Sequence, residues 1–514
     1  MRRKPLVQSL LAALVLGGCA LSAQASDWLQ FGYDATHSNY NNADTGYSTP
    51  GNALLFHATL SAPADSAAIY LSNVQISAGV QKNLLFIGSL NGTLMAVDAD
   101  TGVQAWSQRP STNAGISTGS PIVDPSLQYV YAYAHDGKVH KYRVADGTEI
   151  TAGGWPETST LKTGAEKGAS ALSIGTSSGG VSYLYSVTDG YVGDGGDYQG
   201  HITAINLNDG TQKVFNSSCS NNTNHFTTTS PDCAHAQSGI WGRPGAIYDP
   251  GTNRVFFATG NGLYDAVGGA GFEWGDSLLA LNIDGTGSST VGMPIDSYTP
   301  SSYSNLQGND ADLGSTSPAI LPSVPGSSIV HLGIQGGKDG CVRLLNLANL
   351  SGAGAPAHVG GELQAVSIPS SSNQCTNGDN GDNIRTAPAI WTNPADKSVW
   401  AFYITSGGSV AYKVTVSGGT PSLTQQWSNG TSGTSPIVAN GVLYFVSSNH
   451  VRAVDAASGT QIWDGESIAT IKWQSPILVN GRLYVIDQSS GGDSPSSSQI
   501  WVFQLDGIFR SKFE

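Results

Sequence analysis

The segment GNDADLGSTSP, from Gly308 to Pro318, places two carboxylates, Asp310 and Asp312, in a short stretch rich in glycine. Two close carboxylates suit a hard cation such as Ca²⁺, which prefers oxygen ligands. A carboxylate held beside such a cation can also take the proton of a hydroxyl group. The alternative is a polar turn, because Asp and Gly both favour turns.

Patterns for several other chemistries are missing from the sequence. No P-loop, HExxH or GxSxG occurs in a suitable context, and no CxxCH haem attachment site occurs at all. The Gly-rich turns follow expected strands without a following helix, which argues against a dinucleotide site. The net charge of −14, with no basic stripe to offset it, argues against binding to a nucleic-acid backbone.

Any such site must be positioned by a repeated phrase that runs through the chain. LFIGSLNGTLMAVDADTGVQAW, from Leu85 to Trp106, returns as LYFVSSNHVRAVDAASGTQIW, from Leu443 to Trp463. Each copy alternates apolar runs with polar turns, which predicts three short strands. We expect Asp98 and Gly102 to form a turn and Trp106 to cover its neighbour. The phrase therefore predicts architecture rather than chemistry.

A further strand precedes each unit and is often marked by a small residue followed by Pro. The clearest copies are GSPIV at Gly119, TSPAI at Thr316, TAPAI at Thr386, TSPIV at Thr434 and QSPIL at Gln474, and degenerate copies begin at Asn73, Ala169 and Arg243. Eight units spaced by about forty to seventy residues predict an all-β, eight-bladed propeller. We expect 474–505 to form the last blade and 54–60 to add its outermost strand, which closes the ring. A solenoid is the alternative.

The repeated phrase resembles the repeat of the pyrroloquinoline-quinone (PQQ) propellers over nearly all of the chain after Trp28. That repeat forms quinoprotein alcohol dehydrogenases and also the noncatalytic propeller lipoprotein of the outer-membrane assembly machinery. The repeat alone therefore does not fix the function. The long insertions in blades three to five are where a site is expected, because loops on one face of a propeller surround its axis.

The resemblance implies a metal site and a catalytic base. In the Gly-rich segment 191–210, Asp197 matches a calcium-binding carboxylate, although the family usually has Glu there. Asn261, in the segment ending ATGNG, matches a residue whose carbonyl coordinates the cation. Asp312 is the first candidate for the base that takes the substrate's hydroxyl proton, and Asp310 is the second. Asp312 would also bind the cation.

The resemblance implies a cofactor site as well. Trp241 resembles the family's Trp beneath the planar quinone, but Arg243 competes for the aligned position. Lys338 matches a Lys that contacts the quinone oxygens, where a positive charge would stabilise the reduced cofactor. Arg385 would reach the same face. One feature of the alcohol dehydrogenases is missing, since this chain has no pair of adjacent cysteines to cap the quinone.

The first residues are expected to be an export signal. MRRK is followed by an apolar stretch over 6–18, and two processing sites then compete. Ala23-Gln24-Ala25 fits ordinary cleavage, with one propeller domain over 26–514, whereas 16–19 resembles a lipobox that would lipidate Cys19. We expect a periplasmic or secreted protein, membrane-anchored if Cys19 is lipidated, with no transmembrane segment.

The remaining cysteines agree with an oxidising compartment, because they are even in number. Cys219 and Cys233 flank one polar loop, which predicts a local disulfide between them. The second pair would then be Cys341 with Cys375.

Two functions follow from the resemblance. The first is a quinoprotein-like dehydrogenase that oxidises an alcohol, polyol or sugar with PQQ and Ca²⁺ and passes electrons to an external acceptor. The second is a noncatalytic propeller that docks another envelope protein. The possible lipobox, the missing cysteine pair and the Asp in place of Glu favour the second.

Overall fold

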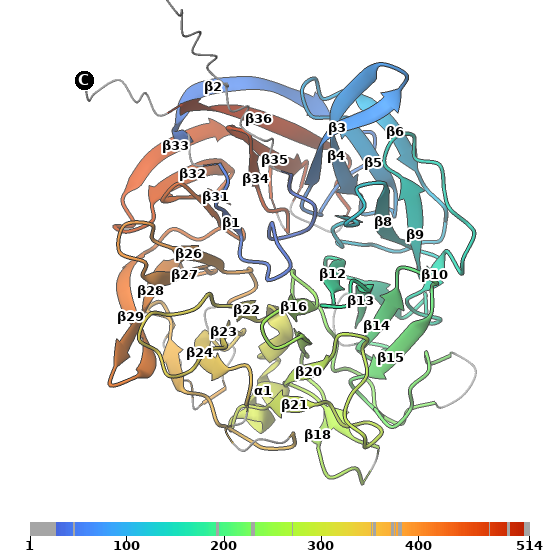
Figure 1. Cartoon of the computed structure of the whole chain (residues 1–514), viewed down its shortest axis with the longest axis vertical. Helices are drawn as coiled ribbons and strands as arrows, with labels where there is room; N and C mark the ends of the chain where they lie inside the picture. Colours follow the sequence, from blue (N-terminus) through green and yellow to red (C-terminus); the bar gives the residue numbers. More distant parts are fainter. Residues whose placement is uncertain are drawn as a thin grey trace, which may run out of the picture.

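In a computed structural model, the chain forms a ring of eight sheets around a central axis (Figure 1). The structure describes residues 27–507 except 45–46, 192–194, 228–231, 270, 351, 353–355, 372–374, 376, 379–382, 472 and 491–493. Each sheet is one blade of an all-β propeller, as the repeat predicts, and successive strands in a blade pair antiparallel.

The first four blades are built as follows. Blade 1 contains β3 (Ile69–Ser77), β4 (Val80–Gly88), β5 (Leu94–Asp98) and β6 (Gln104–Gln108). Blade 2 contains β7 (Ile122–Val123), β8 (Tyr129–Ala134), β9 (Lys138–Arg143) and β10 (Glu157–Thr158). Blade 3 contains β11 (Glu166–Gly168), β12 (Ser173–Thr176), β13 (Ser182–Gly190), β14 (His201–Asn206) and β15 (Gln212–Asn216). Blade 4 contains β16 (Ile247–Asp249), β17 (Arg254–Ala258), β20 (Leu278–Asn282) and β21 (Asp296–Tyr298), and carries a hairpin of β18 (Tyr264–Asp265) and β19 (Glu273–Trp274).

The last four blades complete the ring. Blade 5 contains β22 (Ala319–Ile320), β23 (Leu332–Gln335), β24 (Cys341–Asn346) and β25 (Gln364–Ser367), and is preceded by α1 (Tyr303–Asn309) and the short 3₁₀ helix η1 (Leu313–Ser315). Blade 6 contains β26 (Ala389–Thr392), β27 (Val399–Ile404), β28 (Ser409–Ser417) and β29 (Thr420–Asn429). Blade 7 contains β30 (Ile437–Ala439), β31 (Val442–Ser447), β32 (His450–Asp455) and β33 (Gln461–Ser467), with β1 (Tyr40–Asn41) added parallel to β30. Blade 8 contains β34 (Ile477–Val479), β35 (Arg482–Gln488), β36 (Ser498–Gly507) and β2 (Tyr47–Thr59).

The repeated phrase shapes each blade through its turn. Asp98 accepts the amide of Asp100 at 2.9 Å, and Gly102 takes a φ of +73°, which a residue without Cβ adopts freely. Trp106 reaches the next blade and donates from Nε1 to the carbonyl of Val144 at 3.0 Å. These residues turn the chain and cover a neighbour, as the sequence predicts.

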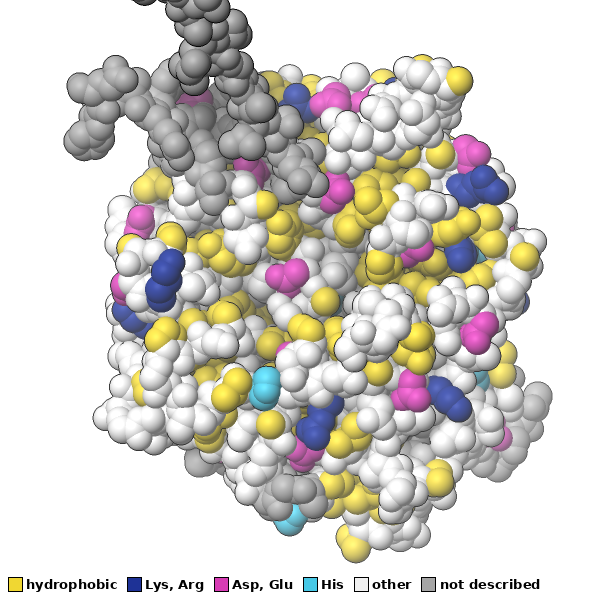
Figure 2. Space-filling model, viewed as in Figure 1, with side chains coloured by type: hydrophobic (Ala, Val, Ile, Leu, Met, Phe, Trp, Pro, Cys, Tyr) yellow, Lys and Arg dark blue, Asp and Glu magenta, His cyan; other side chains and the backbone are white. Residues whose placement is uncertain are grey.

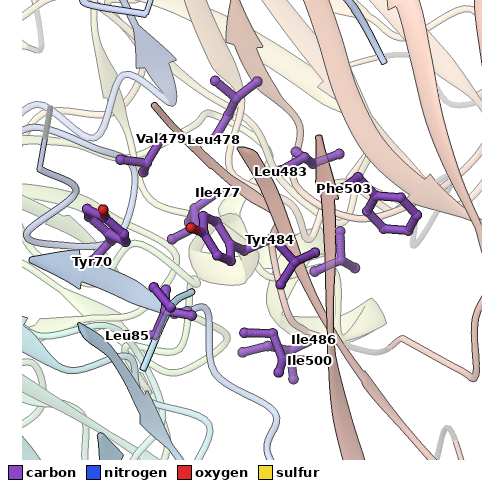
Figure 3. Close-up of a cluster of buried hydrophobic side chains, with 14 of the residues drawn as sticks. Tyr70, Leu85, Ile477, Leu478, Val479, Leu483, Tyr484, Ile486, Ile500 and Phe503 are labelled. Atoms are coloured by element: carbon purple, nitrogen blue, oxygen red, sulfur yellow. The ribbon is translucent and has the colours of Figure 1, made fainter. Parts of the chain in front are cut away.

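The ring closes between the two ends of the chain. Strand β2 pairs antiparallel with β36, and the two lie side by side at the rim (Figure 1). Blade 8 then packs on blade 1 through a large apolar cluster, in which Tyr70 faces Tyr484 with ring centroids 6.0 Å apart (Figure 3). The expected clasp is confirmed, and it is longer than the predicted strand over 54–60.

The segment 27–44 crosses the axis before the first blade begins. Phe31 packs against three alanines from three different blades, namely Ala67, Ala171 and Ala387. The amide of Val123 donates to Leu29, and the amide of Val438 donates to Asn39. This segment ties blades on opposite sides of the ring together at their inner edge.

Both expected disulfides are present, Cys219–Cys233 and Cys341–Cys375. The expected export signal and Cys19 lie outside the described residues. No helix in the described part of the chain is long and apolar enough to cross a membrane. On the face shown in Figure 2, charged side chains of both signs are scattered among uncharged ones.

If the β2–β36 pairing closes the propeller, then Phe503→Ala in β36 will lower the free energy of unfolding by about 3–5 kcal/mol. The substitution leaves a cavity in place of a buried phenyl group. Leu55→Ala in the partner strand is the control, since Leu55 is 44 % exposed and will change stability little. Denaturant unfolding of both variants checks this, and equal losses would contradict the expected role of the clasp.

Candidate functional site

A buried ion cluster lies where blade 5 begins. Lys338 Nζ lies 2.5 Å from Asp312 Oδ2 and 2.6 Å from Asp310 Oδ1. Asp312 is only 2 % exposed, and its carbonyl accepts the amide of Lys338 at 3.0 Å. The cluster is positioned locally by the end of α1, where Asp310 takes a left-handed conformation, and by the turn between β23 and β24, which carries Lys338. Three of the sequence-predicted residues therefore meet.

Asn261 and Trp241 join the same cluster from blade 4. The amide of Asn261 donates to Asp312 Oδ1 at 2.6 Å, while its carbonyl accepts the amide of Ser238 at 2.8 Å. The Lys338 ammonium lies 5.2 Å from the centroid of the Trp241 ring, within cation–π range. Gly260 allows the Asn261 amide to approach Asp312 closely, because a Cβ at position 260 would lie 3.0 Å from Asp312 Oδ1.

The charges in the cluster are set by burial and by their partners. Burial raises the pKa of Asp312 above its usual value, although Lys338 and the Asn261 amide oppose the rise. Burial alone would lower the pKa of Lys338, but the carboxylates of Asp312 and Asp310 outweigh it, so that pKa lies above its usual value. The site thus holds an ionised Lys next to a carboxylate that takes up a proton more readily than an exposed one.

A second buried carboxylate, Asp276, lies behind Asp312. Its Oδ1 accepts the amide of Leu313 at 3.0 Å, and its Oδ2 is buried with no hydrogen-bond partner among the described residues. Burial and the charge of Asp312 raise the pKa of Asp276 well above its usual range. Burial thus favours the protonated form of Asp276 more than that of an exposed Asp.

A cavity of about 620 Å³ is linked to the ion cluster through Trp241 and Trp473, although no residue of the cluster lines it. Among the described residues, its lining includes Arg243, Arg385 and Trp473 together with hydroxyl and amide side chains from blades 6 and 7, and no carboxylate. The Trp473 ring connects the two regions, because its centroid lies 6.5 Å from that of Trp241 and the Arg243 guanidinium stacks on it at 4.5 Å.

Arg243 carries a buried positive charge at this cavity. It is 7 % exposed and donates to the carbonyl and hydroxyl of Thr118 at 3.1 and 2.9 Å. Its Nε is buried without a hydrogen-bond partner, and no ion pair to it exists among the described residues. Burial lowers the pKa of Arg243 to about 10, against weaker opposing effects of Asp65 and Asp189. An anion in the cavity would compensate this charge.

The contacts described for Asp197 do not include any residue of the cluster. Its side chain is 64 % exposed, and its Oδ2 pairs with the buried Lys162 at 2.9 Å. Arg385 is exposed and donates to Asn383 at 3.3 Å, but it lines the same cavity as Arg243. A metal role for Asp197, Asn261 and Asp312 stays a prediction, because a cation at Asp312 would have to displace Lys338 or the Asn261 amide.

Sequence reasoning missed Trp473 and Asp276. Trp473 directly precedes the QSPIL strand of blade 8, which is the position from which other inner strands reach the axis. Asp276 had no distinguishing sequence signal, since a Gly-Asp pair before a strand is an ordinary turn.

The fold and this site define an eight-bladed propeller of PQQ-type repeats. A family model described as outer membrane protein assembly factor BamB matches residues 45–160, 72–213 and 391–497, which together span more than half of the chain. The chain therefore belongs to the PQQ-repeat propeller family. No match was found among curated proteins.

Solved structures share the fold at low sequence identity. The quinohemoprotein alcohol dehydrogenase ADHIIG of Pseudomonas putida HK5 is 13 % identical, with 94 % of this chain and 80 % of that one covered and a TM-score of 0.61. The quinohemoprotein alcohol dehydrogenase of Comamonas testosteroni is 14 % identical, and the match covers 93 % of this chain and 80 % of that one with a TM-score of 0.58. A europium-containing methanol dehydrogenase is 12 % identical, and the match covers 93 % of this chain and 98 % of that one with a TM-score of 0.62.

Lys338→Met will lower the free energy of unfolding by about 3–5 kcal/mol at neutral pH, because it leaves Asp312 buried and unpaired. The pKa of Asp312 will rise further above its unfolded value in this variant. The penalty of this variant will therefore shrink as the pH falls, and it will be lost below about 4, the ordinary pKa of an Asp carboxyl, where Asp312 becomes protonated in both states. Denaturant unfolding across this pH range checks the prediction.

Two controls accompany this variant. Adding Asp312→Asn to Lys338→Met will recover much of the loss, since no buried charge remains. Lys413→Met breaks an ion pair with the exposed Asp396 and will cost little. A Lys338→Met penalty that does not change with pH would contradict the interpretation.

Proposed function

We propose that the protein is a PQQ-dependent dehydrogenase that oxidises an alcohol, polyol or sugar at the axis of the propeller. The observation that carries the proposal is that the Asp312–Lys338 cluster is linked through Trp241 and Trp473 to a cavity lined by Arg243 and Arg385. The shared fold with quinoprotein dehydrogenases supports it.

The residues of the cavity fit an anionic, planar cofactor. PQQ carries three carboxylates, and the buried Arg243 lacks both an ion pair and a partner for Nε in the described structure. The volume of about 620 Å³ is within the range of small-molecule sites. Arg243 and Arg385 would hold the carboxylates, and Trp473 would offer a flat apolar surface.

Asp312 is the residue proposed to take the hydroxyl proton of the substrate. Its raised pKa makes it a stronger base than an exposed Asp, and the adjacent Lys338 keeps it ionised. The raised pKa of the buried Asp276 disfavours a second negative charge beside it. Bound PQQ would supply the two-electron oxidation, and Ca²⁺ would require Asn261 and Asp197 to reach Asp312.

A second candidate function is a noncatalytic propeller that docks an envelope protein. The observation in its favour is that the candidate carboxylates already have cationic partners. Asp310 and Asp312 are paired with Lys338, and Asp197 is paired with Lys162. The matching family description, an outer-membrane assembly factor, agrees with this function.

Adding PQQ and Ca²⁺ to the purified protein will quench tryptophan fluorescence and allow dye reduction with one or more of a panel of alcohols. Asp312→Asn will retain PQQ binding and lose turnover by about 10²–10⁴-fold, because it removes the general base. Arg243→Gln will weaken PQQ binding by about tenfold or more, because a charge-assisted contact is lost. Arg482→Gln, outside the cavity, is the matched control.

Each function has an outcome that excludes it. Neither PQQ binding nor turnover in the wild-type protein would rule out the dehydrogenase. If the Asp197→Ala and Asn261→Ala double variant still binds PQQ and Ca²⁺, then Asp197 and Asn261 are not the metal ligands, although the protein could still be a dehydrogenase. A pull-down from envelope extract without a stoichiometric partner would count against the docking function.

A further inference from the structure

Three side chains of types that can bind metals converge where the loop after β15 meets the β18–β19 hairpin. Cys219 and Cys233 are joined as a disulfide, and donor atoms of Cys219, His235 and Glu273 all lie within 4.8 Å of one another. It is the one such group of three or more His, Cys, Asp or Glu donors within the described ranges. It is separate from the Asp312 cluster.

Glu273 is the buried centre of this group. It is fully buried, and its Oε1 accepts both the amide of Cys219 and Nδ1 of His235 at 3.0 Å. Its Oε2 is also buried but has no hydrogen-bond partner among the described residues. A buried carboxylate oxygen without a donor is costly, and a cation would satisfy it.

We propose that a thiophilic divalent cation such as Zn²⁺ replaces the Cys219–Cys233 disulfide when this bond is reduced. A dithiol reductant supplies two electrons and two protons, becomes a disulfide itself and leaves two thiols. The cation then binds Cys219, Cys233, His235 and Glu273, and the two thiols release their protons. Two thiolates, one imidazole and one carboxylate form a four-coordinate set that Zn²⁺ accepts.

The position of the site gives the exchange a structural consequence. The disulfide joins the two ends of the loop after β15. The amide of Cys219 also donates to Glu273, which ties this loop to β19. The chain continues from His235 to Ser238, whose amide donates to the carbonyl of Asn261 at 2.8 Å. In this proposal, either the disulfide or the bound cation fixes the loop that contacts Asn261. The side chain of His235 is 31 % exposed, which gives solvent access to the site.

The test uses the full chain, reduced anaerobically with a phosphine, and Co²⁺ as the optical probe before Zn²⁺ competition. We expect one Co²⁺ per reduced chain with thiolate charge-transfer absorption and none in the oxidised protein. We also expect Zn²⁺ to raise the Tm of the reduced protein but not of the oxidised one. His235→Ala and Glu273→Gln will each weaken binding by about tenfold or more, because each removes a ligand.

The second disulfide is the internal control. Cys341 and Cys375 belong to no such donor group in the described structure, so a Cys341→Ser and Cys375→Ser variant will keep the Co²⁺ site. Cys219→Ser with Cys233→Ser will lose it. The proposal is overturned if the reduced wild-type chain binds no Co²⁺. It is equally overturned if His235→Ala and Glu273→Gln bind as tightly as the wild type, since the thiols would then bind without the folded site.

Discussion

The pairing of β2 with β36 is the contact on which the rest of the molecule depends. A blade of four short strands is apolar on both faces and must be covered by its neighbours, so a row of blades leaves two faces open until it closes. In this chain the closure joins segments more than 440 residues apart in sequence, and blade 8 can then pack on blade 1. The axial segment around Phe31 fixes the inner edges of the same ring.

Closure also explains why a site can form from distant loops. Each blade begins near the axis, so residues that precede inner strands of different blades become neighbours. Asn261, Asp312 and Lys338 come from successive segments of blades 4 and 5, whereas Trp473 comes from blade 8. The cluster and the cavity meet only because the ring is complete.

The electrostatics of this junction are divided between two regions. In the Asp312 region, Lys338 pairs with both carboxylates, and burial raises the pKa of Asp276. At the cavity, the buried Arg243 is hydrogen-bonded only to the carbonyl and hydroxyl of Thr118 in the described structure, and Asp65 and Asp189 offset its burial only in part. A paired acidic region linked through two Trp rings to a buried Arg is the arrangement that supports the proposed binding of an anionic ligand.

The sequence by itself determined the blade. Apolar alternation, the Asp98–Gly102 turn and the small-residue–Pro strands are local signals, and they predicted the number of blades, the family and the terminal clasp. The loop flanked by Cys219 and Cys233 predicted the first disulfide, and the two remaining cysteines were the expected second pair. The sequence also identified Asp312, Lys338 and Asn261 as candidates, although their chemical roles stay predictions. Only the tertiary structure decided which charges compensate one another. Asp197 pairs with Lys162, the pKa of Asp276 is raised and Arg243 lies over the ring of Trp473, because burial and through-space distance set these states and neither is encoded in local sequence.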